Sequence, residues 1–265
     1  MPKCKLCLKA EADKKNSHII PKFMGERLFE AKPRHGIQID ITGKQSKIQS
    51  IPKEDFIFCS NCEKRFERLE TYFARKLTSI HNYTNEKDKF KVHSGGVNSI
   101  LECFKVSYNA LKLFNYSLVW RASISNHFLF EKYKLPESYE EKLRGILDAN
   151  LFISHSGLIN NFNEIQDDTG LDSYFFKCKV KNEFSRGPFS TYQIGENAFG
   201  LFLVDFIVYT YTNKQSIPKE FDIISDIQDE NALIVMASVE NWREINNESI
   251  KDFKEVIAKQ PNTQK

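Results

Sequence analysis

The chain has 265 residues, of which 41% are hydrophobic and 28% are charged, and it contains 22 Phe and 10 Tyr. This length allows one large domain or two modest ones, and the apolar content is enough to build a hydrophobic core. The most apolar stretch, residues 199–211, is interrupted by Asp205 and is shorter than the ~20 residues that a membrane-spanning helix needs. Because no apolar signal-peptide segment follows Met1, we expect a cytoplasmic protein without a membrane partner.

Positive charge is concentrated in the first third of the chain. Residues 1–93 contain 20 Lys and Arg against 12 Asp and Glu, a formal charge of +8, whereas residues 94–265 contain 18 against 23, a formal charge of −5. A basic segment followed by a mildly acidic one fits a contact with nucleic acid or another polyanion on the N-terminal side. The alternative is an ordinary solvated surface rich in lysine.

Four of the six cysteines form two Cys-x-x-Cys pairs, Cys4 with Cys7 and Cys59 with Cys62. Two such pairs can enclose one zinc ion in a tetrahedral four-thiolate site. In an intracellular chain, this spacing indicates metal binding rather than disulfides. We therefore predict a structural Zn²⁺ held by these four residues. The other two cysteines, Cys103 and Cys178, are expected to be small buried hydrophobic residues.

The first part of the chain predicts short elements followed by one helix. Residues 22–30 fit a short helix interrupted near Gly25, and residues 37–41 alternate like a strand. After Cys62 the apolar residues recur every three or four positions and predict a helix. Its buried face would carry Phe66, Leu69, Phe73 and Leu77. Residues 94–96 are expected to be a domain boundary.

Helices and then strands are expected in the rest of the chain. Apolar spacing from Ile100 to Leu118 predicts a long amphipathic helix that runs towards Trp120, and a second helix is expected to begin at Pro136. Runs of Val, Ile, Phe and Tyr predict strands at residues 174–180, 199–211 and 232–239, before a terminal helix at residues 249–259. The predicted fold class is α+β: a zinc-binding domain over residues 1–93, a larger domain of helices and an antiparallel sheet over residues 97–259, and a disordered tail over residues 260–265.

The box Ser17-His18-Ile19-Ile20-Pro21 lies between the two cysteine pairs, and Glu63 directly follows the second pair. This order resembles the HNH endonucleases that carry a stabilising zinc ion on a ββα-metal core. In that family the histidine of the box acts as general base on a water, and the residues that match Ser17 and Glu63 coordinate a divalent ion. The resemblance implies catalytic roles for His18 and Glu63, with Mg²⁺ or Mn²⁺ held partly by Glu63. Ser17 departs from the family pattern, because a neutral hydroxyl is a poor metal ligand.

The resemblance also implies a nucleic-acid partner. Lys64, Arg65 and Arg68 follow Glu63 and would contact phosphates. The implied activity is metal-dependent phosphodiester hydrolysis, in a context such as bacterial defence or a toxin effector. More loosely, the whole chain resembles a group of uncharacterised bacterial proteins that share the Ser17–Phe23 box and the Cys59–Glu63 segment. The larger domain is expected to regulate the nuclease, bind a protein partner or form a homo-oligomer.

The same residues also allow an interpretation without catalysis. His18 could ligate zinc or hydrogen-bond a backbone carbonyl, and Glu63 could be a favourable residue in the first turn of its helix. The alternative function is a zinc module that binds nucleic acid or protein but does not cleave it.

Two further features concern carboxylates and the Trp120-Arg121 pair. Glu70 lies seven residues after Glu63, about 10 Å along the predicted helix, which is far for one shared ion. Trp120 and Arg121 are expected to pack in the core, with Arg121 in a structural ion pair, for example with Glu140 or Glu141.

Overall fold

The computed structural model describes residues 1–29, 36–39, 45–80, 83–95, 98–131, 133–165, 170–178, 189–193, 196–219, 224, 230–249 and 251. Its N-terminal elements are β1 (Ser17–His18), α1 (Lys22–Gly25), the 3-10 helix η1 (Glu26–Phe29), β2 (Gly36–Ile39), β3 (Gln45–Ile48), β4 (Lys53–Glu54), α2 (Ser60–Ile80) and η2 (Tyr83–Asn85). The middle of the chain forms β5 (Phe90–Gly95), β6 (Asn98–Ser107), α3 (Tyr108–Ile124), η3 (Phe128–Phe130), α4 (Glu137–Asn150), α5 (His155–Asn161) and η4 (Phe162–Glu164). The last elements are β7 (Asp172–Cys178), β8 (Phe189–Gln193), β9 (Ala198–Leu203), β10 (Phe206–Tyr211), η6 (Lys214–Ser216), β11 (Asn231–Ala237) and α7 (Val239–Ser249).

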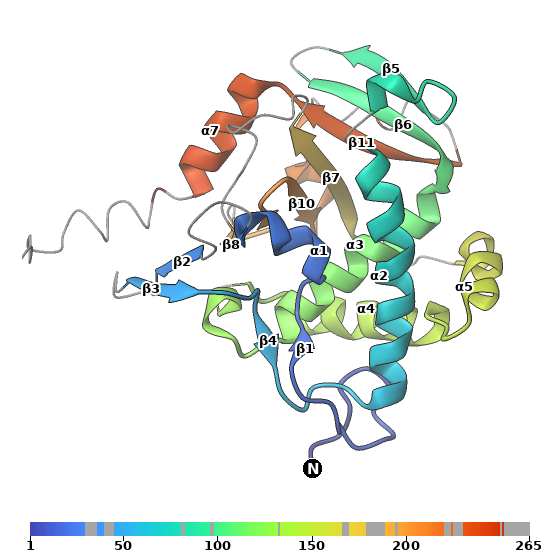
Figure 1. The fold of residues 1–265 in the computed structure, drawn as a ribbon, viewed down its shortest axis with the longest axis vertical. Helices are drawn as coiled ribbons and strands as arrows, with labels where there is room; N and C mark the ends of the chain where they lie inside the picture. The colour runs from blue at the N-terminus through green and yellow to red at the C-terminus, as the bar shows by residue number, and fades with distance from the viewer. Residues whose placement is uncertain are drawn as a thin grey trace, which may run out of the picture.

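A seven-stranded sheet forms the centre of the described chain, in the order β5-β6-β11-β7-β10-β9-β8 (Figure 1). Its neighbouring strands run antiparallel apart from β7 and β11, which are parallel. Two small antiparallel sheets, β1 with β4 and β2 with β3, lie outside it. The predicted mixture of helices and a mainly antiparallel sheet is therefore confirmed, and the parallel pair is an addition that the sequence did not indicate.

Apolar side chains cover both faces of this sheet. On one face, α3 contacts β6, β7, β10 and β11, and almost every residue of this helix is buried because α2 and α4 pack on its other sides. On the opposite face, Trp242 of α7 is buried in a second apolar cluster with residues such as Phe202 and Val235. No helix in the described part of the chain has the length and apolar character needed to cross a membrane.

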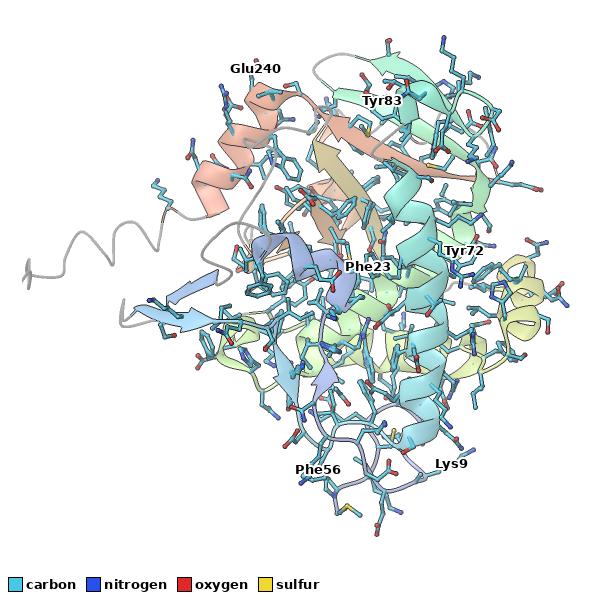
Figure 2. The ribbon with its side chains drawn as sticks, viewed as in Figure 1. Lys9, Phe23, Phe56, Tyr72, Tyr83 and Glu240 are labelled. Atoms are coloured by element: carbon cyan, nitrogen blue, oxygen red, sulfur yellow. The ribbon has the colours of Figure 1, made fainter. Side chains whose placement is uncertain are left out.

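Helix α2 connects the cysteine-bearing loops to the sheet. It runs from the loops beside the N-terminus to the β5–β6 hairpin at the opposite end of the molecule (Figure 1). Figure 2 shows the same separation in its labels, with Lys9 and Phe56 at one end and Tyr83 and Glu240 at the other. The predicted apolar face is confirmed, since the side chains that form it are all at most 3% exposed. They are Phe66, Leu69, Phe73 and Leu77.

The predicted helix from Ile100 to Leu118 is wrong in its first half. Residues 98–107 form β6, and α3 begins only at Tyr108. The side chain of Ser107 accepts a hydrogen bond from the backbone N–H of Ala110 and so caps the helix, as serine often does at this position. Residues 100–103 are buried on both faces of the sheet, so their apolar spacing carries no information about helical periodicity.

The predicted strand at residues 199–211 is two strands. β9 and β10 pair through a tight turn in which the N–H of Asp205 donates to the carbonyl of Leu203. Val204 at the turn has a φ of 63°, in the left-handed region that β-branched residues rarely adopt. The turn is also buried, with Val204 1% exposed. Because the turn contains none of the usual Gly, Asn or Pro residues, the sequence reads as one uninterrupted strand.

The predicted boundary at residues 94–96 begins inside strand β5, which pairs with β6 from Phe90 to Gly95. One apolar core runs from Cys4 and Ile19 through α2 and α3 to the strands of the sheet. The helix α4 and the strands β7 and β11 match expected elements, whereas α7 was not expected. The predicted terminal helix at residues 249–259 lies almost entirely outside the described residues, and the predicted tail at residues 260–265 lies wholly outside them.

Candidate metal centre and adjoining site

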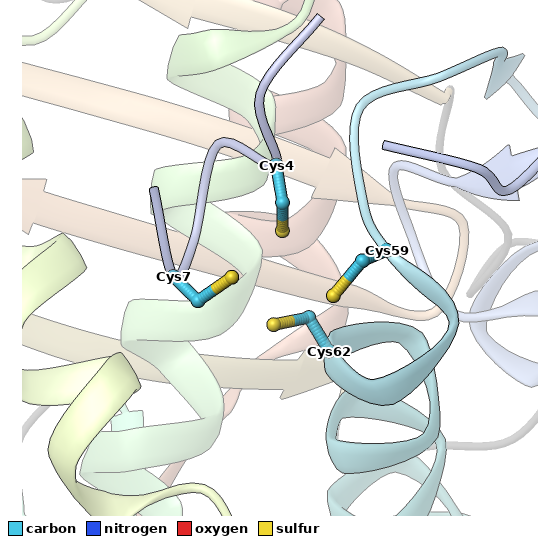
Figure 3. A group of neighbouring side chains, drawn as sticks. All are labelled: Cys4, Cys7, Cys59 and Cys62. Atoms are coloured by element: carbon cyan, nitrogen blue, oxygen red, sulfur yellow. The ribbon is translucent and has the colours of Figure 1, made fainter. Parts of the chain in front are cut away.

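The four paired cysteines meet at one point. The sulfur atoms of Cys4, Cys7, Cys59 and Cys62 all lie within 4.8 Å of one another. Figure 3 shows the four side chains pointing towards a common centre, two from the N-terminal loop, one from the segment just before α2 and one from the first turn of α2. A tetrahedral zinc site with Zn–S bonds of about 2.3 Å needs sulfurs about 3.8 Å apart, so this arrangement could hold a metal ion after small side-chain adjustments. It is the one such cluster of His, Cys, Asp and Glu within the described residues.

Backbone geometry brings the two cysteine pairs together. The N–H of Leu8 donates to the carbonyl of Cys4 at 3.0 Å, and Leu8 adopts a φ of 57°, which closes the first loop tightly. The second pair is fixed by Asp13, whose carboxylate accepts from both the N–H and the Oγ of Ser60 at 2.6 and 2.7 Å. Asp13 thereby caps the start of α2 from the segment that follows the first pair.

The thiols cannot all ionise unless positive charge is supplied. A hydrogen bond from Cys62 lowers the pKa of Cys4 to about 4, despite its burial. The same interaction with Cys4, together with burial, raises the pKa of Cys62. Nearby cations already oppose the negative charge, since Arg65 Nη1 lies 3.8 Å from the sulfur of Cys62 and Arg144 donates to the carbonyl of Leu6 at 2.9 Å. A divalent cation would favour all four thiolates, which is the protonation state that binds metal.

Ser17 of β1 and Glu63 of α2 meet close to this cluster. Strand β1 pairs with β4 in the register His18 to Lys53, and α2 begins at Ser60, between the two cysteines of the second pair. Ser17, only 1% exposed, donates its hydroxyl proton to Glu63 Oε2 at 2.9 Å. Ser17 therefore orients the carboxylate of Glu63 by a hydrogen bond, while His18 follows it on the same two-residue strand.

The imidazole of His18 is half-buried and lies among positive charges. Burial lowers the pKa of His18, and the charges of Lys53, Arg121 and Lys22 lower it further. Among the described residues, its ring nitrogens have no hydrogen-bond partner, and it is not part of the cysteine cluster. The neutral imidazole is thus favoured near pH 7, which leaves one ring nitrogen free to accept a proton.

Arg121 joins this site from α3, and its predicted structural ion pair is formed, with Glu70 as the partner in place of Glu140 or Glu141. Its Nη1 donates to Glu70 Oε1 at 2.5 Å and to the carbonyl of His18 at 3.1 Å. Glu140 instead accepts from Ser123 and Glu141 pairs with Arg144. Burial raises the pKa of Glu70, and the charge of Arg121 opposes that rise. The carboxylate of Glu70 is therefore occupied by Arg121.

The three predicted phosphate-binding residues have different surroundings. Lys64 is exposed. Arg65 donates to Asp148 Oδ1 and to the carbonyl of Leu151, both at 2.8 Å, and also to carbonyls in the last turn of α4. Arg68 donates to the carbonyl of Ile153 at 2.9 Å. Arg65 thus caps α4 with most of its donors, and both arginines border an open cavity of about 820 Å³ beside Cys62.

The two remaining cysteines behave differently from the cluster. Cys103 is buried, and burial raises the pKa of its thiol to about 12, as expected for a core residue. Cys178 ends β7, and its side chain lies outside the described atoms.

No protein-family model, curated protein or solved structure matches this chain. The geometry of the cysteine cluster and of the adjoining Ser17–Glu63 contact therefore carries the functional argument.

Proposed function

We propose that the chain is a zinc-stabilised phosphodiesterase that hydrolyses nucleic acid with an HNH-type site. The observation that carries this proposal is the hydrogen bond from Ser17 to Glu63, which places the strand of His18 against the first turn of α2 beside four converging cysteines. The pairing of β1 with β4, and the position of α2 directly after β4, support this proposal. In the chain, α1, η1, β2 and β3 lie between the two strands. A bacterial defence or toxin role is suggested by the sequence resemblance alone and stays an expectation.

Zinc is the metal we propose for the cysteine cluster, because four thiolates in a closed tetrahedral arrangement favour Zn²⁺. The cluster joins the N-terminal loop to the start of α2, and Glu63 is the residue directly after Cys62. The zinc ion would then fix the position of Glu63 without taking part in the reaction.

His18 is the proposed general base. Its neutral form is favoured, its ring nitrogens have no partner among the described residues, and a base of this kind accepts the proton that an attacking water loses. The positive charges of Lys22, Lys53 and Arg121 around it suit an anionic substrate such as a phosphodiester. After cleavage, the imidazolium formed at His18 returns its proton to solvent.

Glu63 is the residue that would hold a catalytic divalent ion. Mg²⁺ commonly takes one or two carboxylates and completes its coordination with waters and substrate phosphate, so a single oriented carboxylate suits it. Such an ion would supply charge stabilisation to the phosphate group. Ser17 contributes by holding Glu63 Oε2, which leaves Oε1 as the more available oxygen.

The test is cleavage of plasmid DNA and of single-stranded RNA with Mg²⁺, Mn²⁺ or Ni²⁺, after one zinc per chain has been established by metal analysis. We expect His18→Ala to lower the cleavage rate by about 10²- to 10⁴-fold, the usual contribution of a general base. The matched control is His93→Ala, since His93 lies on β5, at the opposite end of α2 from the cysteine pairs (Figure 1). Equal rates for wild type and His18→Ala would contradict the assignment.

A non-catalytic zinc module that binds nucleic acid is the second candidate. It is favoured by Ser17, which puts a neutral hydroxyl where the HNH pattern has a metal ligand. If the zinc-loaded wild type binds DNA or RNA but cleaves neither with any of the three ions, this second function replaces the first.

A further inference from the structure

We propose that Arg121 is a positioning residue for the site, so that the part of the chain after residue 97 completes the site rather than only accompanying it. This inference rests on the proposed function. It starts from a contact between two distant parts of the chain, in which Arg121 on α3 donates to the backbone carbonyl of His18 on β1 at 3.1 Å. A bond to the main chain of the proposed base fixes the strand from which its imidazole projects.

The surroundings of Arg121 hold its guanidinium in one place. Its side chain is 2% exposed, and its Nε donates to the carbonyl of Ser117 one turn earlier in α3 at 3.0 Å. The guanidinium carbon lies 4.9 Å from the centre of the Phe66 ring, and Glu70 Oε1 supplies the balancing charge at 2.5 Å. Both Phe66 and Glu70 belong to α2, as does Glu63. Arg121 therefore sets the distance between the strand of His18 and the helix of Glu63.

The two terminal nitrogens of the Arg121 guanidinium differ in their hydrogen bonding. Nη2 of Arg121 is buried and has no hydrogen-bond partner among the described residues. Buried donors without partners are rare and cost free energy, so their presence needs an explanation.

The same end of α3 also holds the strand that pairs with β1. Glu54, which lies opposite Ser17 in β4, accepts hydrogen bonds from Ser125 Oγ at 2.8 Å and from the N–H of Asn126 at 3.0 Å. Both strands of the small sheet are thus attached to α3 and the residues just after it. Arg121 is the attachment that reaches His18 itself.

The experiment compares Arg121→Gln/Glu70→Gln with Lys134→Gln, with each protein loaded with zinc. The double variant removes both buried charges together, which avoids leaving Glu70 unpaired. Lys134 is the matched control because it donates to the carbonyls of Ser123 and Ser125, at 2.7 and 2.6 Å, and so ties the same end of α3 without contacting His18. Folding is checked by circular dichroism and thermal unfolding, and rates are measured well below each melting temperature.

Two rates are measured for each protein. In the first, we expect the double variant to lose about 10²-fold in cleavage rate at saturating substrate with little change in KM, as a misplaced group does, while Lys134→Gln stays within about 3-fold of wild type. In the second, which needs no activity, the rate at which diethyl pyrocarbonate modifies His18 is followed by mass spectrometry. We expect that rate to change in the double variant alone.

The two rates distinguish a failure of the positioning role from a failure of the proposed function. If the wild type does not cleave, the nuclease proposal fails, and a changed modification rate of His18 still supports the positioning role. An unchanged modification rate, or a folded double variant that cleaves like the wild type, overturns that role.

Discussion

The hydroxyl of Ser17 determines how the proposed site can bind a divalent ion. It is buried and donates to Glu63 Oε2, so it orients the carboxylate while adding no charge. Glu63 is therefore the carboxylate left for the proposed ion on this part of α2, since Glu70 is paired with Arg121. We expect Mg²⁺ or Mn²⁺ to bind weakly in the absence of substrate. The affinity for the ion should rise when a substrate phosphate supplies further ligands.

Replacing Ser17 with aspartate tests whether residue 17 and Glu63 can share a divalent ion. In Ser17→Asp two carboxylates would lie within hydrogen-bonding distance, so we expect a loss of about 1–3 kcal/mol in the free energy of unfolding without a divalent ion. Mn²⁺ would relieve this repulsion and raise the melting temperature of Ser17→Asp more than that of wild type.

The control for this change is Ser17→Ala, which removes the hydrogen bond and costs about 1 kcal/mol without adding a ligand. Differential scanning fluorimetry across a Mn²⁺ titration measures all three proteins. A melting temperature of Ser17→Asp that does not respond to Mn²⁺ would show that Glu63 and residue 17 do not share an ion.

The protonation of His18 predicts how cleavage depends on pH. Burial and neighbouring cations lower the pKa of His18, so the neutral base persists below the pH at which an ordinary histidine gains a proton. We expect the rate to fall on the acidic side only below the usual histidine range, and to be level through neutral pH. A pH–rate profile of kcat/KM measures this limb. An acidic limb above about pH 6.5 would contradict the assignment of His18 as the base.

At the scale of elements, two neighbouring cations on α2 have different surroundings, because one of them caps α4. Arg65 directs most of its donors to the end of α4, whereas Lys64 beside it is exposed. We expect Arg65→Ala to lower the free energy of unfolding by about 2–4 kcal/mol, because it leaves several carbonyls and Asp148 without their partner. Lys64→Ala should leave unfolding within about 0.5 kcal/mol of wild type.

The effects on nucleic-acid affinity should be reversed, with Lys64→Ala weakening binding more than Arg65→Ala. If Lys64 contacts a phosphate, Lys64→Ala would weaken binding of a DNA duplex and reduce the slope of log K against log salt by about 1. Fluorescence anisotropy at several salt concentrations measures this slope. An unchanged slope would remove Lys64 from the interface.

Some elements and contacts could be predicted from the sequence because their signals are local. The Cys-x-x-Cys pairs predicted that the four cysteines lie together, and the spacing of Phe66 to Leu77 predicted the buried face of α2. The β6 strand was missed because residues buried on both faces have no alternation, and the β9–β10 turn was missed because Val204 takes an unusual conformation. Arg121 was assigned the wrong partner because Glu70 lies 51 residues away and only tertiary packing brings them together.

At the scale of the whole molecule, one core joins the cysteine-bearing part to the sheet. Trp120 of α3 stacks with Phe58 and Phe66 at centroid distances of 6.0 and 6.3 Å, and Phe114 stacks on Phe73 at 4.3 Å. Each such pair contributes about 0.5–1.5 kcal/mol beyond the burial of its area. The first 93 residues therefore depend on α3 for the packing of α2.

A fragment of residues 1–93 is expected to lack a stable fold even with zinc, because it would expose the apolar face of α2. We expect poorly dispersed amide resonances and no cooperative thermal transition for the fragment, and a single cooperative transition for the full chain. Nuclear magnetic resonance and calorimetry of both proteins in equimolar zinc measure this. A folded, zinc-loaded fragment would show that residues 1–93 form an independent domain, as their composition first indicated.

The closeness of the four cysteine sulfurs would also make the protein sensitive to oxidation. With their sulfurs within 4.8 Å of one another, the thiols need only small movements to form disulfides at the ~2.05 Å bond length if an oxidant acts on them. A bound cation would protect the thiolates, and oxidation would expel that cation and release the start of α2 from the N-terminal loop. The element that assembles the site would then also switch it off under oxidative stress, and a thiol reductant with added zinc would restore it.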